Sequence, residues 1–141
     1  MHRYIGYATV CPLSSLLPHE KTDDAQVFTI KSLLARAGGL FLPILVDTST
    51  FIIIDGHTRC EALRQLGCTR TMAMMVDYSS KFISVEGWHG EIIRKQQVIK
   101  AASTGMLMQS KTTRHLVRMH NTLVHLSAIC PPIWIPLEEL R

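Results

Sequence analysis

Acidic, imidazole and guanidinium side chains stand together at residues 55–59, which read Asp-Gly-His-Thr-Arg. An apolar run precedes them, and apolar residues at helical spacing follow them as far as Gly67, so the segment predicts a strand, a sharp corner and a helix. A glycine at such a corner allows a ligand to come close, and the first amides of the helix are unpaired and partly positive. His57 and Arg59 add side-chain donors. The segment therefore predicts a phosphate site; the alternative is an ordinary corner with Asp55 as cap and Arg59 in solvent.

A second polar cluster follows at Lys111, Thr112, Thr113, Arg114 and His115. It supplies two hydroxyls and up to three positive groups, which can bind a carboxylate or a phosphate. The alternative is a solvated helix N-terminus that Thr112 or Thr113 caps.

Composition and charge limit the class of protein. The 141 residues are 47% hydrophobic, which suits one domain over residues 1–141. No stretch is long and apolar enough to cross a membrane, so no membrane partner is expected. The net charge of +4 suits an anionic partner, but no long basic run favours nucleic acid. The cysteines lack metal-site spacing and indicate a reduced, intracellular protein, which we expect to be cytoplasmic: Cys11, Cys60, Cys68 and Cys130.

Short strands and two helices must position these clusters. Helical periodicity predicts a helix from Asp23 or Asp24 to Ala37, with Gly38 and Gly39 ending it, and a second helix around Lys95 to Ala102. A connecting loop before the first helix presents His19 and Glu20. Strands are predicted at Tyr4 to Val10, Ile44 to Val46, Phe51 to Ile54, Thr71 to Val76 and Phe82 to Val85, with a turn at Asp47 to Thr50 and a last strand and short helix within residues 130–141.

Five segments, taken in order, carry a resemblance to a known family. They are Leu17-Pro18-His19-Glu20, Asp55-Gly56-His57-Thr58-Arg59 with Glu61-Ala62-Leu63, Val76-Asp77-Tyr78, Trp88, and Lys111-Thr112-Thr113-Arg114-His115. This pattern resembles the ParB and sulfiredoxin-like superfamily, and within it the free L-serine kinases. The resemblance implies an α/β fold of the α+β type, a single domain with a small mixed sheet flanked by helices.

The resemblance also implies an activity and a set of site residues. The activity is transfer of a phosphoryl group from ATP or ADP, with Mg²⁺, to free L-serine, which gives O-phospho-L-serine. By position, Glu20 would act on the serine hydroxyl, with Asp55 and His57 also catalytic. The nucleotide phosphates would bind at Gly56, His57, Thr58 and Arg59, and the amino acid at Trp88, Thr112, Thr113, Arg114 and His115. No residue is assigned as a metal ligand.

One departure and two alternatives stay open at this point. The family often has a second histidine where this chain has Thr58, and a hydroxyl can donate to phosphate but cannot carry positive charge. A ParB-like regulator would use the same corner to bind a nucleotide as a switch, or would bind DNA. A ParB-like nuclease would need an acidic metal site, for which Asp55, Glu61 and Asp77 are candidates. Sulfiredoxin chemistry is not expected, because Cys60 lies one residue beyond the corner and suits a core position.

Overall fold

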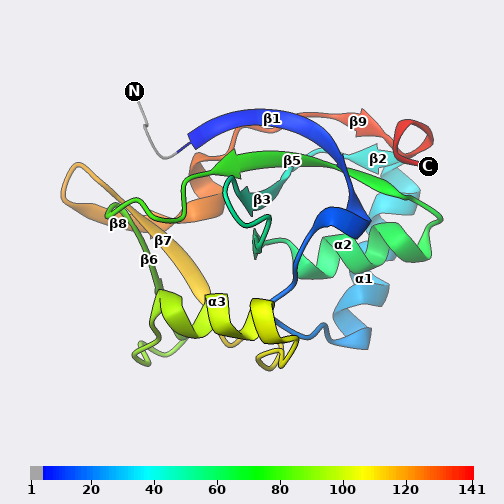
Figure 1. Ribbon diagram of the computed structural model, residues 1–141. Coiled ribbons are helices and arrows are strands. Elements are labelled where there is room, and N and C mark those ends of the chain that lie inside the picture. The colour runs from blue at the N-terminus through cyan, green and yellow to red at the C-terminus, as the bar shows by residue number, and fades with distance from the viewer. Residues whose placement is uncertain (1–4) are drawn as a thin grey trace.

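A four-stranded mixed sheet forms the centre of the computed structural model, which describes residues 5–141 (Figure 1). The inner strands β5 and β3 are parallel, and each outer strand is antiparallel to its neighbour. In spatial order the strands are β1 (Ile5–Pro12), β5 (Arg70–Val76), β3 (Ile44–Asp47) and β4 (Ile53–Asp55).

The central sheet is covered on both faces, because successive residues of a strand point to opposite sides. Ile44 and Val46 of β3 pack into one apolar cluster with residues of α1 (Asp24–Ala37) and α2 (His57–Gln65). Leu45, between them, packs into a second cluster that includes Val98 of α3 (Lys95–Thr104) and Val117 of β7 (Arg114–Met119). The fold is therefore a mixed α/β arrangement with a core on each side of the sheet.

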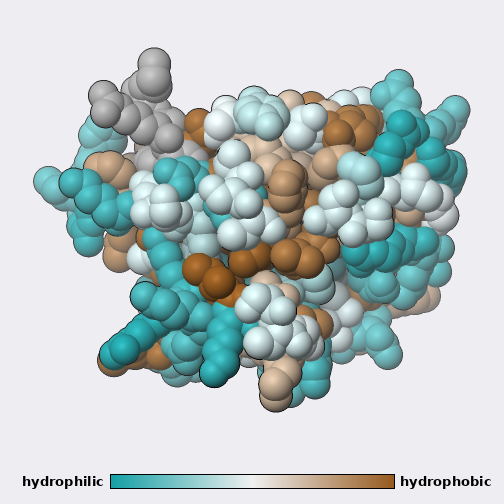
Figure 2. Space-filling view, in the orientation of Figure 1, coloured by the Kyte–Doolittle hydropathy of each residue, from teal (hydrophilic) through white to brown (hydrophobic). Residues whose placement is uncertain are grey.

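Two smaller sheets complete the fold. The strands β6 (Ile83–Glu86), β7 and β8 (Thr122–His125) form an antiparallel sheet, and β2 (Gly39–Leu40) pairs with β9 (Ile135–Pro136). Three short 3₁₀ turns follow β1, β8 and β9, at Leu13–Ser15, Leu126–Ile129 and Leu137–Leu140. Polar side chains surround an apolar band on the face shown in Figure 2.

The predicted helices are confirmed, together with the residues that limit them. The Asp23 side chain accepts a hydrogen bond from the Ala25 amide at 3.3 Å at the start of α1, and Gly38 adopts the left-handed conformation at its end. Gly105 ends α3 in the same conformation. The first strand was predicted from Tyr4, which lies outside the described residues.

Two predictions of local structure are wrong. Phe51 was placed in a strand, but its φ is +62° and its side chain is 43% exposed, so it belongs to the turn before β4. The polar cluster at 111–115 was predicted as a loop or a helix start, yet Arg114 and His115 begin β7. The β7–β8 hairpin was not predicted; it turns at His120 and Asn121, both with positive φ, which hairpin turns of this kind require.

Candidate active site

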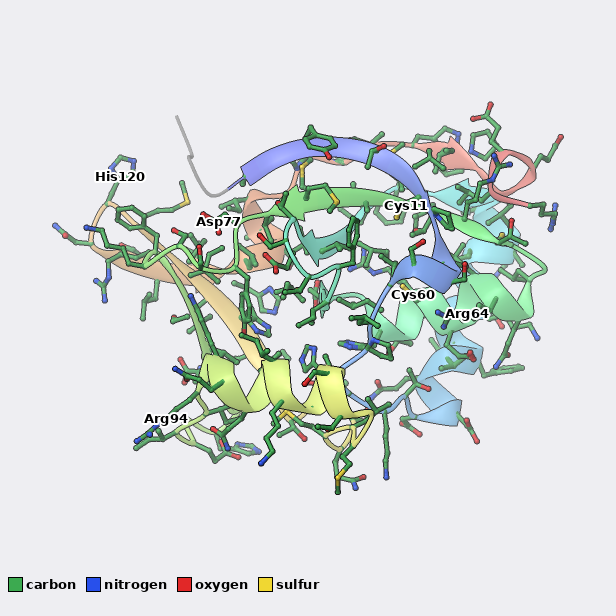
Figure 3. The ribbon with its side chains drawn as sticks, in the orientation of Figure 1. Cys11, Cys60, Arg64, Asp77, Arg94 and His120 are labelled. Carbon is green, nitrogen blue, oxygen red and sulfur yellow. The ribbon has the colours of Figure 1, made fainter. Side chains whose placement is uncertain are left out.

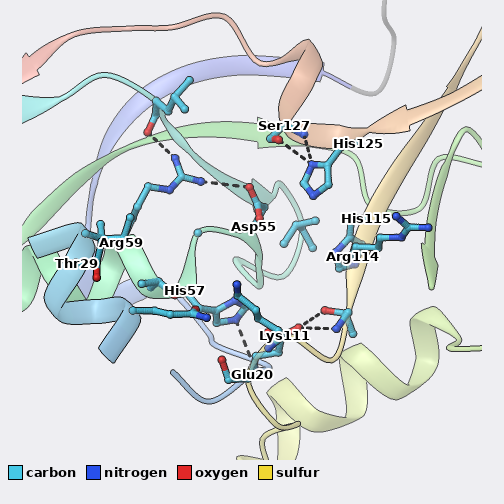
Figure 4. Close-up of a pocket in the computed structure, with 18 of the residues that line it drawn as sticks. Glu20, Thr29, Asp55, His57, Arg59, Lys111, Arg114, His115, His125 and Ser127 are labelled. Carbon is cyan, nitrogen blue, oxygen red and sulfur yellow. Dashed lines mark hydrogen bonds and ion pairs between the residues drawn. The ribbon is translucent and has the colours of Figure 1, made fainter. Parts of the chain in front are cut away.

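A cavity of about 750 Å³ lies between the corner before α2, one face of α1 and the start of β7. Figure 4 shows Glu20, His57 and Lys111 on one side of it and His125 and Ser127 on the other, with Asp55 between them. Nearly all of the predicted site residues line this cavity: Glu20, Asp55, Gly56, His57, Thr58, Arg59, Trp88, Thr113, Arg114 and His115. Segments from four separate parts of the sequence therefore meet at one site.

Gly56 forms the sharp corner that the sequence predicted. Its φ is +120°, and a Cβ there would lie 2.8 Å from Cδ1 and 3.0 Å from Cγ2 of Ile44. Only glycine fits this backbone and this space. Gly56 is also the N-cap of α2, and no side chain caps the helix. The first amides of α2 are therefore available to an anion at the cavity wall.

Arg59 is held within the protein rather than in solvent. Its Nη1 donates to the carbonyl oxygens of Leu42 and Pro43 at 2.8 and 3.0 Å, and its Nη2 donates to Asp55 Oδ2 at 3.2 Å. Three of the five guanidinium N–H groups are thus used. Asp55 is not the helix cap of the alternative interpretation, because it orients Arg59 instead. The two N–H groups of Arg59 that remain are available to bind a ligand.

His57 is a neutral hydrogen-bond acceptor at the base of the cavity. Its Nε2 lies 3.0 Å from the amide nitrogen of His19 and 3.4 Å from that of Glu20. Because an amide can only donate, Nε2 carries no hydrogen and the ring hydrogen is on Nδ1. Burial lowers the pKa of His57 to about 3. His57 therefore fixes the Glu20 backbone and can offer one N–H donor, but no positive charge at neutral pH.

Glu20 is held by the loop before β7. Its Oε1 accepts the Lys111 amide at 3.0 Å, and its Oε2 accepts the Thr113 amide at 2.9 Å and bonds the Thr113 hydroxyl. Backbone bonds of Met108 to His19 and Lys21, each 2.8 Å, fix the two segments side by side. Burial raises the pKa of Glu20, and the hydrogen bonds from Thr113 and Lys111 oppose this rise. A carboxylate of increased basicity thus lines the cavity.

Arg114 and Trp88 form another wall. The Arg114 guanidinium carbon lies 5.8 Å from the centre of the Trp88 ring, and Nη2 bonds Glu86 Oε2 at 3.3 Å. Among the buried side-chain nitrogen and oxygen atoms of residues 5–141, Nε of Arg114 alone has no hydrogen-bond partner. Trp88 is 45% exposed, so it is not the core residue that a lone tryptophan suggests. Arg114 thus lines the cavity, and one of its donors, the buried Nε, is not used.

Two predicted residues have less direct positions. Thr112 is not among the residues that line the cavity, and its hydroxyl donates to the Gln109 carbonyl at 2.6 Å. His115 is almost fully buried, and its Nε2 bonds the Tyr78 hydroxyl at 2.9 Å. Burial also holds the pKa of His115 well below its usual range. Arg114 and His115 are neighbours in β7 and therefore point to opposite sides of the strand. This explains why His115 is buried while Arg114 is partly exposed.

Known proteins share this architecture. No protein-family model matches the chain. The ATP-dependent L-serine kinase of Staphylothermus marinus is 26% identical over 85 residues, which are 57% of this chain and 34% of that kinase. The ParB-like protein of Sulfolobus acidocaldarius is 36% identical over 56 residues, or 40% of this chain and 28% of that protein. The chain thus covers about a third of the length of these relatives.

A solved structure of a free serine kinase in complex with AMP matches with a TM-score of 0.82 and 15% identity, over 95% of this chain and 93% of that one. The chain has the free serine kinase fold. The predicted resemblance to the ParB and sulfiredoxin-like superfamily is confirmed, as is the mixed α/β class.

Sequence reasoning missed part of the cavity in this free serine kinase fold. His125 Nδ1 accepts from the amide and the hydroxyl of Ser127 at 3.1 and 2.7 Å, and its ring centre lies 6.1 Å from that of Trp88. Because the Ser127 amide can only donate, Nδ1 carries no hydrogen and the ring hydrogen is on Nε2. Phe41, 53% exposed, and the α1 residues Ile30 and Leu33 form an apolar wall. A His-x-Ser spacing and an amphipathic helix were visible in the sequence, but nothing in it joined them to the site.

The acidic residues are not clustered as a metal site requires. Residues 5–141 contain no group of three or more His, Cys, Asp or Glu side chains placed to hold a metal ion. Asp55, Glu61 and Asp77 are thus not the acidic cluster that the nuclease alternative needs. Cys60 is buried on α2, and burial raises the pKa of its thiol to about 12, which disfavours a nucleophilic role (Figure 3). None of the helices within residues 5–141 is long and apolar enough to cross a membrane.

Proposed function

We propose that residues 1–141 form one catalytic domain that transfers a phosphoryl group from ATP or ADP to the hydroxyl of free L-serine. The observation that carries the proposal is the position of Glu20, a half-buried carboxylate held at the cavity between the glycine corner and Arg114. The L-serine kinase activity of the Staphylothermus relative and the AMP complex of the matching fold support it.

The nucleotide phosphates would bind at the corner. Phosphoryl transfer depends mainly on positioning and charge stabilisation, and the available groups are the amides of α2, the Thr58 hydroxyl, the His57 Nδ1–H and the remaining donors of Arg59. The apolar wall at Phe41 and Leu33 suits a purine base. Since no metal-binding cluster lies within residues 5–141, Mg²⁺ would enter as the magnesium complex of the nucleotide, bound to its phosphates.

Serine would bind on the opposite side of Glu20. Its carboxylate needs a cationic donor, and the Arg114 guanidinium lines the cavity, with only its Nη2 bonded to Glu86. The Nε2–H of His125 is a second donor on the same side. Trp88 would cover the small substrate and exclude water.

Glu20 would be the general base. Its carboxylate takes the hydroxyl proton as the serine oxygen attacks the terminal phosphorus, and the bond from that phosphorus to the bridging oxygen breaks. His57 contributes by fixing the Glu20 backbone through two amide bonds. Burial raises the pKa of Glu20, which makes its carboxylate a stronger base than that of an exposed glutamate.

Phosphorus NMR tests the proposal. The purified protein would be incubated with Mg²⁺, L-serine and either ATP or ADP, and the new resonance would be compared with authentic O-phospho-L-serine. We expect the phosphoserine signal with at least one donor, and the same signal from Thr112→Val, whose side chain lies outside the cavity. Nucleotide binding without phosphoserine from either donor would contradict the proposal.

A nucleotide-dependent switch is the second candidate, and the ParB-like relative favours it. A switch would bind the nucleotide at the same corner without transfer to serine. DNA affinity separates the two: a kinase should bind DNA weakly and with steep salt dependence, whereas a DNA-binding regulator keeps affinity for some sequence at moderate salt.

A further inference from the structure

His19 is a fully buried histidine beside Glu20, and neither the resemblance nor the proposed reaction assigns it a role. Its Nδ1 lies 2.8 Å from the Ile53 carbonyl oxygen, and its Nε2 lies 3.1 Å from the Thr113 hydroxyl oxygen. A carbonyl oxygen only accepts, so the ring hydrogen is on Nδ1 and Nε2 carries a lone pair. Burial lowers the pKa of His19 to about 4, so the ring is neutral at physiological pH. His19 Nε2 therefore needs a donor.

The only hydrogen bond to His19 Nε2 within residues 5–141 is with the Thr113 hydroxyl, which also bonds Glu20 Oε2. A hydroxyl has one hydrogen. While Glu20 is ionised, that hydrogen can satisfy Glu20 or His19 but not both. The cluster of Glu20, Thr113 and His19 is thus one proton short when the carboxylate is charged.

A single proton on Glu20 completes the cluster. The Glu20 carboxyl then donates to the Thr113 oxygen, and the Thr113 hydroxyl donates to His19 Nε2. The amides of Lys111 and Thr113 bond Glu20 Oε1 and Oε2, which remain acceptors in either state. A buried acceptor without a donor costs free energy. Protonation of Glu20 removes this cost, because His19 Nε2 then has a donor.

We propose that His19 is a positioning residue that acts through the Thr113 hydroxyl to favour transfer of the substrate proton to Glu20. This inference rests on the proposed function, in which that proton comes from the serine hydroxyl. The O–H bond of serine breaks and an O–H bond forms on Glu20. Proton rearrangement within the cluster then leaves the Glu20 hydrogen facing Thr113 and the Thr113 hydrogen facing His19. No other group gains or loses a proton.

Several titratable or charged groups surround Glu20 and affect the same equilibrium. Asp55 raises the pKa of Glu20 through charge repulsion. His57, which is neutral, lies with Nε2 3.4 Å from the Glu20 amide nitrogen. His115 is also neutral, and its ring centre lies 5.8 Å from that of His19. Lys21 and Lys111 line the cavity nearby. None of these groups changes in the experiment below, so their effect is constant across the variants.

The direct test measures the pKa of Glu20 without any substrate. Carbon-13 NMR of glutamate labelled at the side-chain carboxyl would follow its titration, with Glu20→Gln used to assign the resonance. The proteins are the wild type, His19→Phe, Thr113→Val and the double variant, with Thr113→Ser as the matched control that keeps the hydroxyl. Phenylalanine keeps a ring in the buried space but removes the acceptor.

We expect His19→Phe to lower the pKa of Glu20 by about one unit when Thr113 is present. The same change should have no effect in the Thr113→Val background, and Thr113→Ser should resemble the wild type. An unchanged pKa in His19→Phe, or an equal shift in both backgrounds, would overturn the inference.

A second measurement needs no change at His19. The nitrogen-15 resonance of His19 Nε2 should shift as Glu20 is protonated, with the same midpoint as the Glu20 carbon resonance, and the coincidence should be lost in Thr113→Val. Independent midpoints in the wild type would overturn the inference. Both readouts are separate from activity: coupling without phosphoserine would refute the kinase proposal alone, and phosphoserine without coupling would refute the role of His19 alone.

Discussion

Replacing Gly56 with alanine tests the geometry of the corner. The φ of +120° is one that an L-residue adopts at a cost of about 1–3 kcal/mol. The new Cβ would also lie 2.8 Å from Cδ1 of Ile44, which is fully buried in β3, and overpacking of a core adds about 1–3 kcal/mol. We therefore expect Gly56→Ala to lower the free energy of unfolding by about 3 kcal/mol and to weaken nucleotide binding.

Urea denaturation of matched variants separates the two contributions. Gly38 also has a positive φ, +77°, but a Cβ there meets no atom within 4 Å, so Gly38→Ala should cost only about 1–2 kcal/mol. Ile44→Val removes Cδ1, and in that background Gly56→Ala should cost about 1 kcal/mol less than in the wild type. The reasoning fails if Gly56→Ala and Gly38→Ala are equally destabilising, or if Ile44→Val gives no relief.

Three further predictions concern Arg59, Phe41 and the buried histidines. Arg59→Lys should lower the free energy of unfolding by about 2 kcal/mol in urea, because an ammonium cannot span Asp55 and two carbonyls; an unchanged urea midpoint would contradict this. Phe41→Ala should raise the nucleotide Kd about tenfold by calorimetry without a change in the free energy of unfolding. A nucleotide affinity equal to that of the wild type would show that the base does not contact Phe41. His19 and His57 have folded pKa values of about 4 and about 3, below the unfolded value of about 6.5, so they stabilise the fold above pH 6.5 and this stability is lost as the pH falls toward 3. The urea midpoint should fall across that range and do so less steeply in His57→Gln; a flat profile would count against neutral buried histidines.

Local signals predicted the elements that hold the site. The Asp23 cap and the Gly38 stop fixed the limits of α1, and the glycine after an apolar run located the corner. These features depend on neighbours in the sequence, which is why pattern and turn chemistry were sufficient. Gly56 and His57 were identified from residue type and position, whereas Glu20 was identified through the resemblance to the free serine kinases.

Long-range contacts could not be predicted in the same way. Arg59 was expected as a side-chain donor to phosphate, but the carbonyls of Leu42 and Pro43 accept two of its hydrogens. Residue type gives no sign of which backbone carbonyls a side chain will meet. His57 was expected as a side-chain donor to the ligand, yet its Nε2 accepts two amides from residues 19 and 20. His125 comes from a hairpin whose His-Asn turn lacks the usual glycine signal.

The most direct test of the account separates binding from chemistry in Glu20→Gln. Nucleotide affinity by calorimetry and phosphoserine formation by single-turnover assay would be measured on the same preparation, beside the wild type. We predict nucleotide affinity close to that of the wild type and a rate of transfer lower by at least about a hundredfold, because the amide keeps the shape of Glu20 but cannot accept the proton. Transfer at the rate of the wild type would contradict the role of Glu20 as the base.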